Sequence, residues 1–317
     1  MRVFSTLVVV GVTVASLGCV TLVSAAKPVV PGTGQEVPNV GDDFEDANWT
    51  YIHNGTKSSY NLDKSRREPS GYSENERWYE GIKRGHPDIV KRIPTPKNGL
   101  PGSRGALLLQ SRNTGRPGRP SYITQQDDFI CDIYDRLGEK IPVWQTPSCV
   151  ARIFLPPVDQ WENRSGAHIA FRISLDARTR FRYETYWPGM IFVFESKTES
   201  GKPHDYAYIR IRADENGNDY KAKQITTTGW WTVGMSVTPD GMVHYYAKPG
   251  TEDLTADDHI GSEFSGGWRA SRFRTFFFNV LSADDGHSWS TPLIVDDPKL
   301  YVIGRQSIAG QPRRQSR

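Results

Sequence analysis

The stretch 167–176, "AHIAFRISLD", alternates apolar and polar side chains over almost its whole length. A period of two residues is typical of a β-strand with one buried face and does not fit the 3.6-residue period of an amphipathic helix. The stretch 206–214, "YAYIRIRAD", repeats this alternation. The apolar side chains expected to face a core are Ile169, Phe171, Ile173, Leu175, Ala207, Ile209 and Ile211. Both stretches are therefore predicted to be half-buried strands.

Further stretches of strand character lie between turn-forming residues, and no stretch has a convincing helical pattern. A tight hairpin is expected at Pro239 to Gly241. The additional strands are predicted at 105–111, 149–156, 190–196, 230–237, 242–248, 273–281 and 292–297. This pattern predicts an all-β protein built as an antiparallel β-sandwich or jelly roll, with a barrel as the alternative.

The back half of the chain resembles the concanavalin A-like lectin/glucanase superfamily. The residues that carry the resemblance are "GWWTVGMSVTPDGMVHYYAKPG" (229–250) and the late acidic strand "PLIVDDPKLYVI" (292–303). The resemblance implies a jelly roll that binds glycans on one concave sheet. A second segment, 95–130, is similar to a segment of secreted proteins of unassigned function.

The ends of the chain differ in composition from its middle. Residues 1–25 combine Arg2 with an uninterrupted apolar run, which predicts a signal peptide, with an uncleaved anchor as the alternative. We expect an extended leader at 26–41, one sandwich domain at 42–303 with a loop-rich excursion at 57–105 over one face, and a disordered basic tail at 304–317. The protein is accordingly expected outside the cell or in the periplasm or envelope, with no stable membrane span after cleavage.

Two cysteines, Cys131 and Cys149, remain after signal cleavage. In an oxidising compartment such a pair can close a disulfide loop, so we predict a bridge between them. Their spacing lacks the neighbouring Cys and His residues of a zinc site.

The charge balance argues against nucleic acid as a partner. The chain has 39 basic and 36 acidic residues, a net charge of only +3. Nucleic-acid-binding proteins usually concentrate a larger basic excess on one surface.

The polar sides of 167–176 and 206–214 form a basic, aromatic face in this prediction. Arginine pairs with carboxylate or sulfate through a planar fork, and tyrosine offers a flat ring and a hydroxyl to a sugar. Trp187 is a candidate sugar-stacking residue, and the loop "NTGRPGRPS" (113–121) adds two arginines to the rim. The predicted glycan-binding residues are Arg172, Tyr206, Tyr208, Arg210, Arg212, Trp187, Arg116 and Arg119, beside His168. The alternative is a solvated outer face, with the 113–121 loop as a spacer.

Three classes of function remain open on this sequence. The first is binding of an anionic polysaccharide. The second is a polysaccharide lyase that would use Tyr206, Tyr208, His168 and Arg172, or another glycan-cleaving enzyme on the same fold; the alginate-lyase and glucanase signatures are missing. The third is a structural envelope protein without catalysis.

Acidic residues near both ends of the domain suggest a cation. The resemblance implies that a structural calcium ion ties the first and last strands together. The preferred ligands are Glu45 and Asp297, with Asp42, Asp43 and Asp296 as further candidates. Ordinary solvated acidic turns are the alternative.

The stretch 282–289, "SADDGHSW", resembles the Asp-box of sialidases with Ser288 in place of threonine. In sialidases this motif repeats once per propeller blade, whereas this chain has one copy. A sialidase-like propeller is therefore a minor alternative, and a well-formed hairpin turn is the main interpretation.

Overall fold

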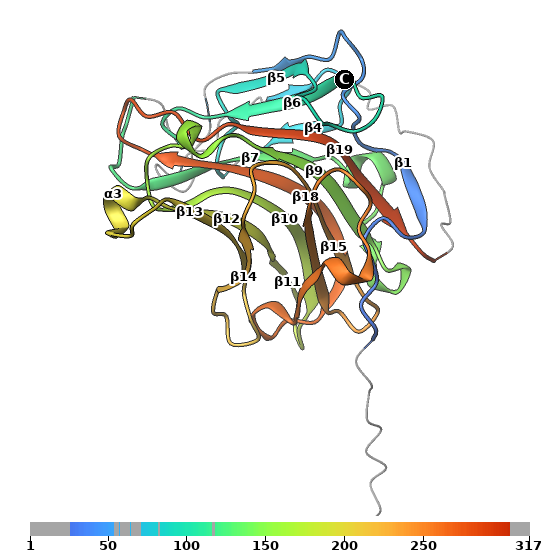
Figure 1. Cartoon of the computed structure of the whole chain (residues 1–317). Helices are drawn as coiled ribbons and strands as arrows, with labels where there is room; N and C mark the ends of the chain where they lie inside the picture. The colour runs from blue at the N-terminus through green and yellow to red at the C-terminus, as the bar shows by residue number, and fades with distance from the viewer. Residues whose placement is uncertain are drawn as a thin grey trace, which may run out of the picture.

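The computed structural model describes residues 26–53, 57, 64, 71–81, 83–115 and 118–304. These residues form two antiparallel sheets that pack face to face (Figure 1). The expected signal peptide and residues 305–317 of the expected tail lie outside the described residues. None of the helices described has both the length and the apolar character needed to cross a bilayer.

The 8-stranded sheet has the order β17-β16-β15-β9-β19-β6-β5, with β1 paired to β19. Its strands are β1 (Gln35–Gly41), β5 (Ile89–Pro94), β6 (Gly105–Gln110), β9 (Ser148–Leu155), β15 (Gly229–Val237), β16 (Val243–Pro249), β17 (His259–Glu263) and β19 (Leu293–Val302).

The 11-stranded sheet has the order β14-β13-β12-β10-β18-β7-β4-β3-β2, with β11 paired to β10 and β8 to β18. Its strands are β2 (Tyr51–Ile52), β3 (Tyr72–Ser73), β4 (Trp78–Glu80), β7 (Thr124–Cys131), β8 (Ile141–Pro142), β10 (Gly166–Arg178), β11 (Tyr183–Tyr186), β12 (Gly189–Glu195), β13 (Tyr206–Arg212), β14 (Tyr220–Ile225) and β18 (Ala270–Ala283). Two four-residue helices, α2 (Tyr134–Leu137) and α3 (Lys197–Ser200), lie in connections.

Each stretch that the sequence predicted as a strand lies in one, so the β-sandwich prediction is confirmed. The predicted hairpin also forms: Gly241 has a φ of 85° in the turn between β15 and β16. A barrel and a propeller are both wrong, because the described strands form two stacked sheets.

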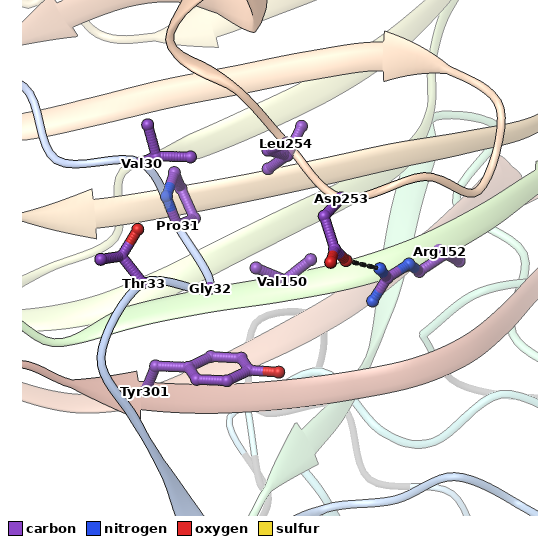
Figure 2. A pocket seen from close by; sticks show the side chains of 9 residues that line it. All are labelled: Val30, Pro31, Gly32, Thr33, Val150, Arg152, Asp253, Leu254 and Tyr301. Carbon is purple, nitrogen blue, oxygen red and sulfur yellow. Dashed lines mark hydrogen bonds and ion pairs between the residues drawn. The ribbon is translucent and has the colours of Figure 1, made fainter.

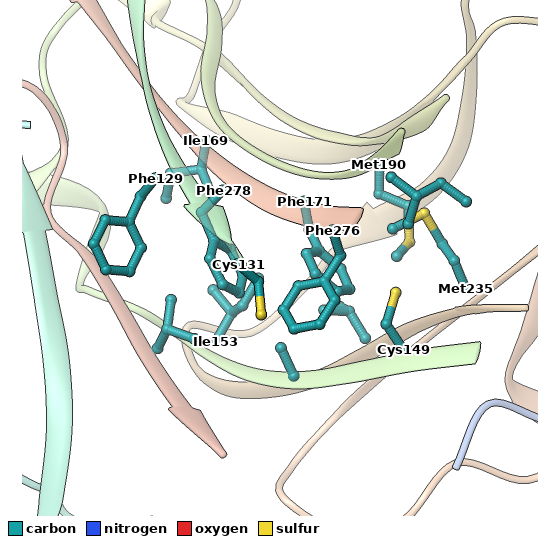
Figure 3. Packing of buried hydrophobic residues seen from close by; sticks show 14 of the residues in the cluster. Phe129, Cys131, Cys149, Ile153, Ile169, Phe171, Met190, Met235, Phe276 and Phe278 are labelled. Carbon is teal, nitrogen blue, oxygen red and sulfur yellow. The ribbon is translucent and has the colours of Figure 1, made fainter. Parts of the chain in front are cut away.

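Aromatic side chains from both predicted and unpredicted strands fill the core. Trp78 on β4 stacks on Phe129 of β7 with ring centroids 4.7 Å apart, and Phe171 on β10 stacks on Phe278 of β18 at 5.1 Å. Figure 3 shows several of these rings together with Ile153 of the facing sheet. Burial of such large apolar surfaces is the main force that holds the two sheets together.

The predicted disulfide is absent: Cys131 and Cys149 are both free and fully buried. Cys131 lies on β7 and Cys149 on β9, in opposite sheets, and in Figure 3 their sulfur atoms stand apart with the Phe276 ring drawn between them. Facing sheets are about 10 Å apart, whereas a disulfide usually joins Cα atoms about 4.4–6.8 Å apart. Both cysteines thus serve as small core side chains.

The leader is more ordered than predicted. Residues 35–41 form β1, which pairs with β19, so the sandwich begins before Asp42. The Ser236 hydroxyl and the Ser148 hydroxyl bond to the backbone of Val29 and Gly32, respectively. This holds the leader over the 8-stranded sheet beside a cavity of about 130 Å³, which Val150, Arg152 and Tyr301 also line (Figure 2).

The described part of the loop-rich excursion 57–105 includes three short strands. Its described part contributes β3 and β4 to the 11-stranded sheet and β5 to the 8-stranded sheet. These strands extend the sandwich at the end where Trp78 completes the aromatic core. The sequence signal was weak because β3 and β4 have only two and three residues.

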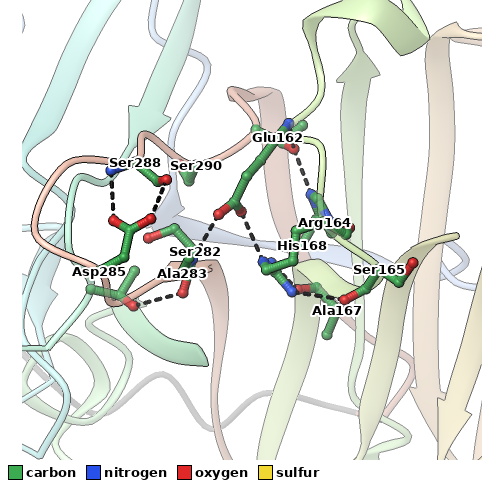
Figure 4. A network of polar contacts seen from close by, with 12 residues as sticks. Glu162, Arg164, Ser165, Ala167, His168, Ser282, Ala283, Asp285, Ser288 and Ser290 are labelled. Atoms are coloured by element: carbon green, nitrogen blue, oxygen red, sulfur yellow. Dashed lines mark hydrogen bonds and ion pairs between the residues drawn. The ribbon is translucent and has the colours of Figure 1, made fainter. Parts of the chain in front are cut away.

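The Asp-box resemblance corresponds to a turn between β18 and β19. Asp285 accepts hydrogen bonds from the backbone N–H groups of His287 and Ser288, at 2.9 and 2.8 Å, and from the Ser288 hydroxyl (Figure 4). This agrees with the hairpin-turn interpretation, and the single motif has no propeller blade around it.

Candidate functional site

Arg172 lies on the outer face of the 11-stranded sheet, in one row with residues of three other strands. It is opposite Phe277 of β18 on one side and Gly189 of β12 on the other. Gly189 is in turn opposite Arg212 of β13. Residues directly opposite each other in antiparallel strands share a face. We call this surface the Arg–Tyr face and define it by Arg172, Tyr206, Tyr208, Arg210 and Arg212.

The Arg172 guanidinium is buried without a carboxylate partner. The residue is 7% exposed, and its Nε and Nη2 donate to the carbonyl oxygen of Trp187 at 3.2 and 2.6 Å. The guanidinium carbon lies 5.5 Å from the centre of the Phe277 ring. Within the described residues, Arg172 has no Asp or Glu oxygen within the 4 Å of an ion pair.

The electrostatic surroundings of Arg172 are positive overall. Burial and the nearby Arg212 lower the pKa of Arg172 to about 10, and Asp128 opposes this shift. The side chain is still protonated at neutral pH. A buried cation with no counter-ion is costly, and a bound anion would relieve that cost.

Two stacked tyrosines lie further along β13. Tyr206 and Tyr208 have ring centroids 6.1 Å apart, and the Lys221 ammonium lies 5.4 and 5.1 Å from the two rings. The Tyr208 hydroxyl donates to Glu195 at 3.2 Å. Burial and the Glu195 carboxylate raise the pKa of Tyr208, so its hydroxyl stays protonated. The pair therefore offers a ring platform and a hydroxyl donor.

A second row crosses the face between the tyrosines and Arg172. Ala170 of β10 is opposite Ile191 of β12, which is opposite Arg210 of β13. Ala170, Ile191 and Val193 form a small apolar cluster, and Arg210 lies 3.5 Å from Asp219. The floor of the face is therefore an apolar strip bordered by cations.

Trp187, the candidate sugar-stacking residue, lies beside Arg172. Its backbone carbonyl holds the Arg172 guanidinium, while its side chain is 44% exposed. The Lys83 ammonium lies 5.9 Å from the Trp187 ring centre. An exposed indole beside an anchored arginine suits a ligand with both a ring and a charge.

Three polar residues on β7 and β18 were missed by the sequence prediction. Asp128 Oδ1 accepts hydrogen bonds from Gln126 at 3.0 Å and from Asn279 at 2.6 Å. Burial raises the pKa of Asp128 to about 6, and Arg84 and Arg172 partly oppose the shift. Gln126 and Asp128 are two residues apart on a strand, which is the signal that could have placed them on one face.

His168 does not belong to the Arg–Tyr face, so its proposed role as a base is wrong. The register of β10 against β12 shifts between Ala167 and Ile169, and this irregularity turns His168 toward Trp161 and Phe194 of the core. Its two ring nitrogens bond to the Thr291 hydroxyl and the Arg164 carbonyl, at 2.6 and 2.7 Å. Figure 4 shows it within this network. Burial lowers the pKa of His168 to about 3.

The 113–121 loop carries the two predicted rim arginines. Arg119 is exposed and has no hydrogen-bond or ion-pair partner within the described residues, and Arg116 lies outside them. The loop is anchored at Gly115, whose N–H donates to Asp127 at 3.1 Å. The rim and spacer interpretations both stay open.

The candidate calcium ligands all have protein partners. Glu45 bonds to Arg104 and to the Gly105 N–H, and Asp297 pairs with Lys299 at 2.9 Å. The remaining carboxylates have these contacts: Asp42 with Trp49 and Asn75, Asp43 with the Glu45 N–H, and Asp296 with Ser103. No group of three or more His, Cys, Asp or Glu residues able to hold a metal occurs among the described residues. Calcium binding stays a prediction.

No protein-family model and no curated protein sequence matches this chain. Solved structures with a similar fold include an endo-β-1,4-glucuronan lyase from Trichoderma reesei (12% identity, TM-score 0.37, 80% of this chain and 94% of that chain). An alginate lyase from Klebsiella pneumoniae (6%, 0.42, 82% and 97%) and lectin II from Ulex europaeus (10%, 0.36, 68% and 99%) are also similar. Identities this low bear on the fold alone, and we take the chemistry from this chain's own side chains.

Proposed function

We propose that this protein binds an anionic polysaccharide along the Arg–Tyr face, outside the cell or in the cell envelope. The observation that carries the proposal is the buried Arg172 guanidinium, which the Trp187 carbonyl holds and which forms no ion pair with a carboxylate of the described residues. Arg210 and Arg212 add positive charge from the neighbouring strand β13.

The arrangement suits a chain of charged sugars better than a free inorganic anion. The row from Phe277 through Arg172 and Gly189 to Arg212 spans four neighbouring strands. With about 4.8 Å between strands, it extends roughly 14 Å across the sheet. The stacked Tyr206 and Tyr208 and the exposed Trp187 provide ring surfaces beside the cations. Alternating charge and ring contacts match a polymer that repeats carboxylate or sulfate groups on sugar rings.

A polysaccharide lyase is the second candidate, and Asp128 is the observation that favours it. A carboxyl group with a pKa of about 6 is suited to proton transfer near neutral pH. In that role Arg172 would pair with a uronate carboxylate, and Asp128 would accept the acidified proton beside it. Tyr208 lies on β13, four strands from Asp128 on β7, and would contact a neighbouring sugar of the polymer.

The test is binding of the full chain to a polyuronate, a sulfated polysaccharide and a neutral glucan at low and high salt. We expect the anionic polymers to bind and the neutral glucan to bind weakly, with affinity falling as salt screens the exposed arginines. Equal affinity for all three polymers, or none for any, would contradict the proposal. Growth of ultraviolet absorbance from an unsaturated product on the polyuronate would identify the lyase.

A further inference from the structure

Lys57 is a buried ammonium between two carboxylates, on the core side of β7 and apart from the Arg–Tyr face. Its Nζ lies 2.9 Å from Asp88 Oδ2 and 2.5 Å from Asp127 Oδ2. The Lys57 side chain is 2% exposed and that of Asp127 is fully buried. Lysine and aspartate are rarely so enclosed. The Lys57 amine, a potential nucleophile, therefore lies against the Asp127 carboxyl group in a region that solvent does not reach.

One loop, residues 111–115, orients both carboxylates. The Arg112 N–H donates to Asp88 Oδ2 at 2.6 Å, and the Gly115 N–H donates to Asp127 Oδ1 at 3.1 Å. The second oxygen of Asp127 faces the Lys57 ammonium. The backbone thus polarises the Asp127 carboxyl group through Oδ1, as an oxyanion-stabilising donor does.

The charges of the cluster allow proton exchange. Burial raises the pKa of Asp127 above its usual range, which favours the neutral form of this carboxyl group. Burial alone would lower the pKa of Lys57, but Asp127 and Asp88 outweigh it and raise the value. Asp88 Oδ2 accepts a hydrogen bond from Lys57 Nζ, and its side chain is 28% exposed. Asp88 therefore links the Lys57 ammonium to solvent.

We infer that Lys57 and Asp127 are joined in the folded protein by an amide bond between their side chains, with Asp88 as the proton carrier. Asp88 accepts one proton from the Lys57 ammonium, and the neutral amine attacks Cγ of the protonated Asp127. The Nζ–Cγ bond forms and the Cγ–Oδ2 bond breaks. The departing oxygen leaves as water, carrying the Asp127 proton and one returned by Asp88. The nitrogen then passes a second proton to Asp88 and keeps one as the amide hydrogen, so the step needs no oxidant or other reagent.

Two physical effects favour this condensation over the reverse hydrolysis. Fixed intramolecular reactants behave as if present at about 10⁵–10⁸ M. The product also replaces a buried ammonium and a buried carboxyl group with a neutral amide, which removes their desolvation cost. Because Cys131 and Cys149 are free, this bond would also be the covalent staple that the two thiols do not supply.

Intact mass of the denatured, purified full chain tests the inference directly. We expect the wild-type protein to be lighter than its sequence, counted from its measured N-terminus, by one water molecule. Digestion should give one branched peptide joining the Lys57 and Asp127 fragments, with no tryptic cleavage after Lys57. The variant Lys57→Arg, which keeps the charge, should have its full sequence mass.

Asp88→Asn provides the second variant, because it preserves the shape at position 88 and removes the proton acceptor. We expect this chain to fold, by its circular dichroism, and to keep its full sequence mass. A wild-type chain at full sequence mass that trypsin cleaves after Lys57 would leave only an ion pair and overturn the inference. An undiminished cross-link in Asp88→Asn would overturn the role of Asp88.

Discussion

Arg172 and Gly189 are opposite each other on β10 and β12, and the arginine side chain lies across the glycine. A Cβ atom at position 189 would overlap Cγ of Arg172 and lie 2.7 Å from the carbonyl oxygen of Phe171. Because Gly189 has no side chain, the Arg172 side chain can lie across β12 at this position. The proposed anion site depends on this pair.

Gly189→Ala is therefore expected to weaken binding of a polyuronate and to lower the free energy of unfolding by about 1–3 kcal/mol, the usual cost of overpacking. Calorimetric titration and chemical denaturation measure the two effects. The matched control is Gly234→Ala on β15 of the other sheet, where a Cβ would crowd Leu254 and Pro31. The control should lose stability and keep its affinity. Equal loss of affinity in both variants would mean that binding reports only stability.

Two variants of Tyr208 separate the contribution of its hydroxyl from that of its ring. Tyr208→Phe keeps the ring and loses a hydrogen bond to Glu195 that is internal to the protein, so we expect polymer affinity to be little changed. Tyr208→Ala should weaken binding more strongly, because the stacked pair with Tyr206 is lost. Equal losses of affinity in Tyr208→Phe and Tyr208→Ala would contradict a binding role for the stacked rings.

Asp128 is expected to make stability depend on pH. Its pKa is raised from 3.8 to about 6 in the folded protein, so between these values the folded state binds more protons than the unfolded state. The free energy of unfolding contributed by this group is therefore highest below pH 4 and falls as pH rises toward 6, by about 3 kcal/mol at most. Other buried groups titrate nearby, so the wild-type curve is compared with that of Asp128→Asn.

The Asp128→Asn variant should lack this decline, and the difference between the two denaturation series isolates the group. Protonation of Asp128 also removes a negative charge that would compete with a sulfate group for Arg172. In the wild-type protein, affinity for a fully sulfated polymer should therefore rise as pH falls through 6. Parallel stability curves for the two proteins would show that Asp128 does not titrate in this range.

The two core cysteines should be unreactive in the native protein. Burial raises the pKa of both thiols, and neither is accessible. We expect a thiol reagent to label Cys131 and Cys149 only after unfolding, and the melting temperature to be the same with and without reductant. A melting temperature that falls when reductant is added would contradict the free thiols and support the disulfide that the sequence suggested.

The alternating strands were predictable because one side of each is apolar, as in 167–176 and 206–214. The strand β7, "TQQDDFIC", escaped prediction because Asp127 occupies a core-facing position, where Lys57 and the Gly115 N–H are its partners. The irregularity at His168 was equally hidden, because register is set by pairing between strands. Alternation placed Arg172 and Arg212 on polar sides, but their alignment through Gly189 is a property of the sheet order β10-β12-β13.

The most direct test of the central claim is calorimetric titration of a polyuronate into the wild-type protein and Arg172→Gln. Lys91→Gln, an exposed cation on β5 of the other sheet, is the control. Hydrogen bonds to charged groups contribute about 1.5–3 kcal/mol, so we predict a loss of at least tenfold in affinity for Arg172→Gln and an unchanged value for Lys91→Gln. Wild-type affinity in a folded Arg172→Gln protein would contradict the Arg–Tyr face as the binding site.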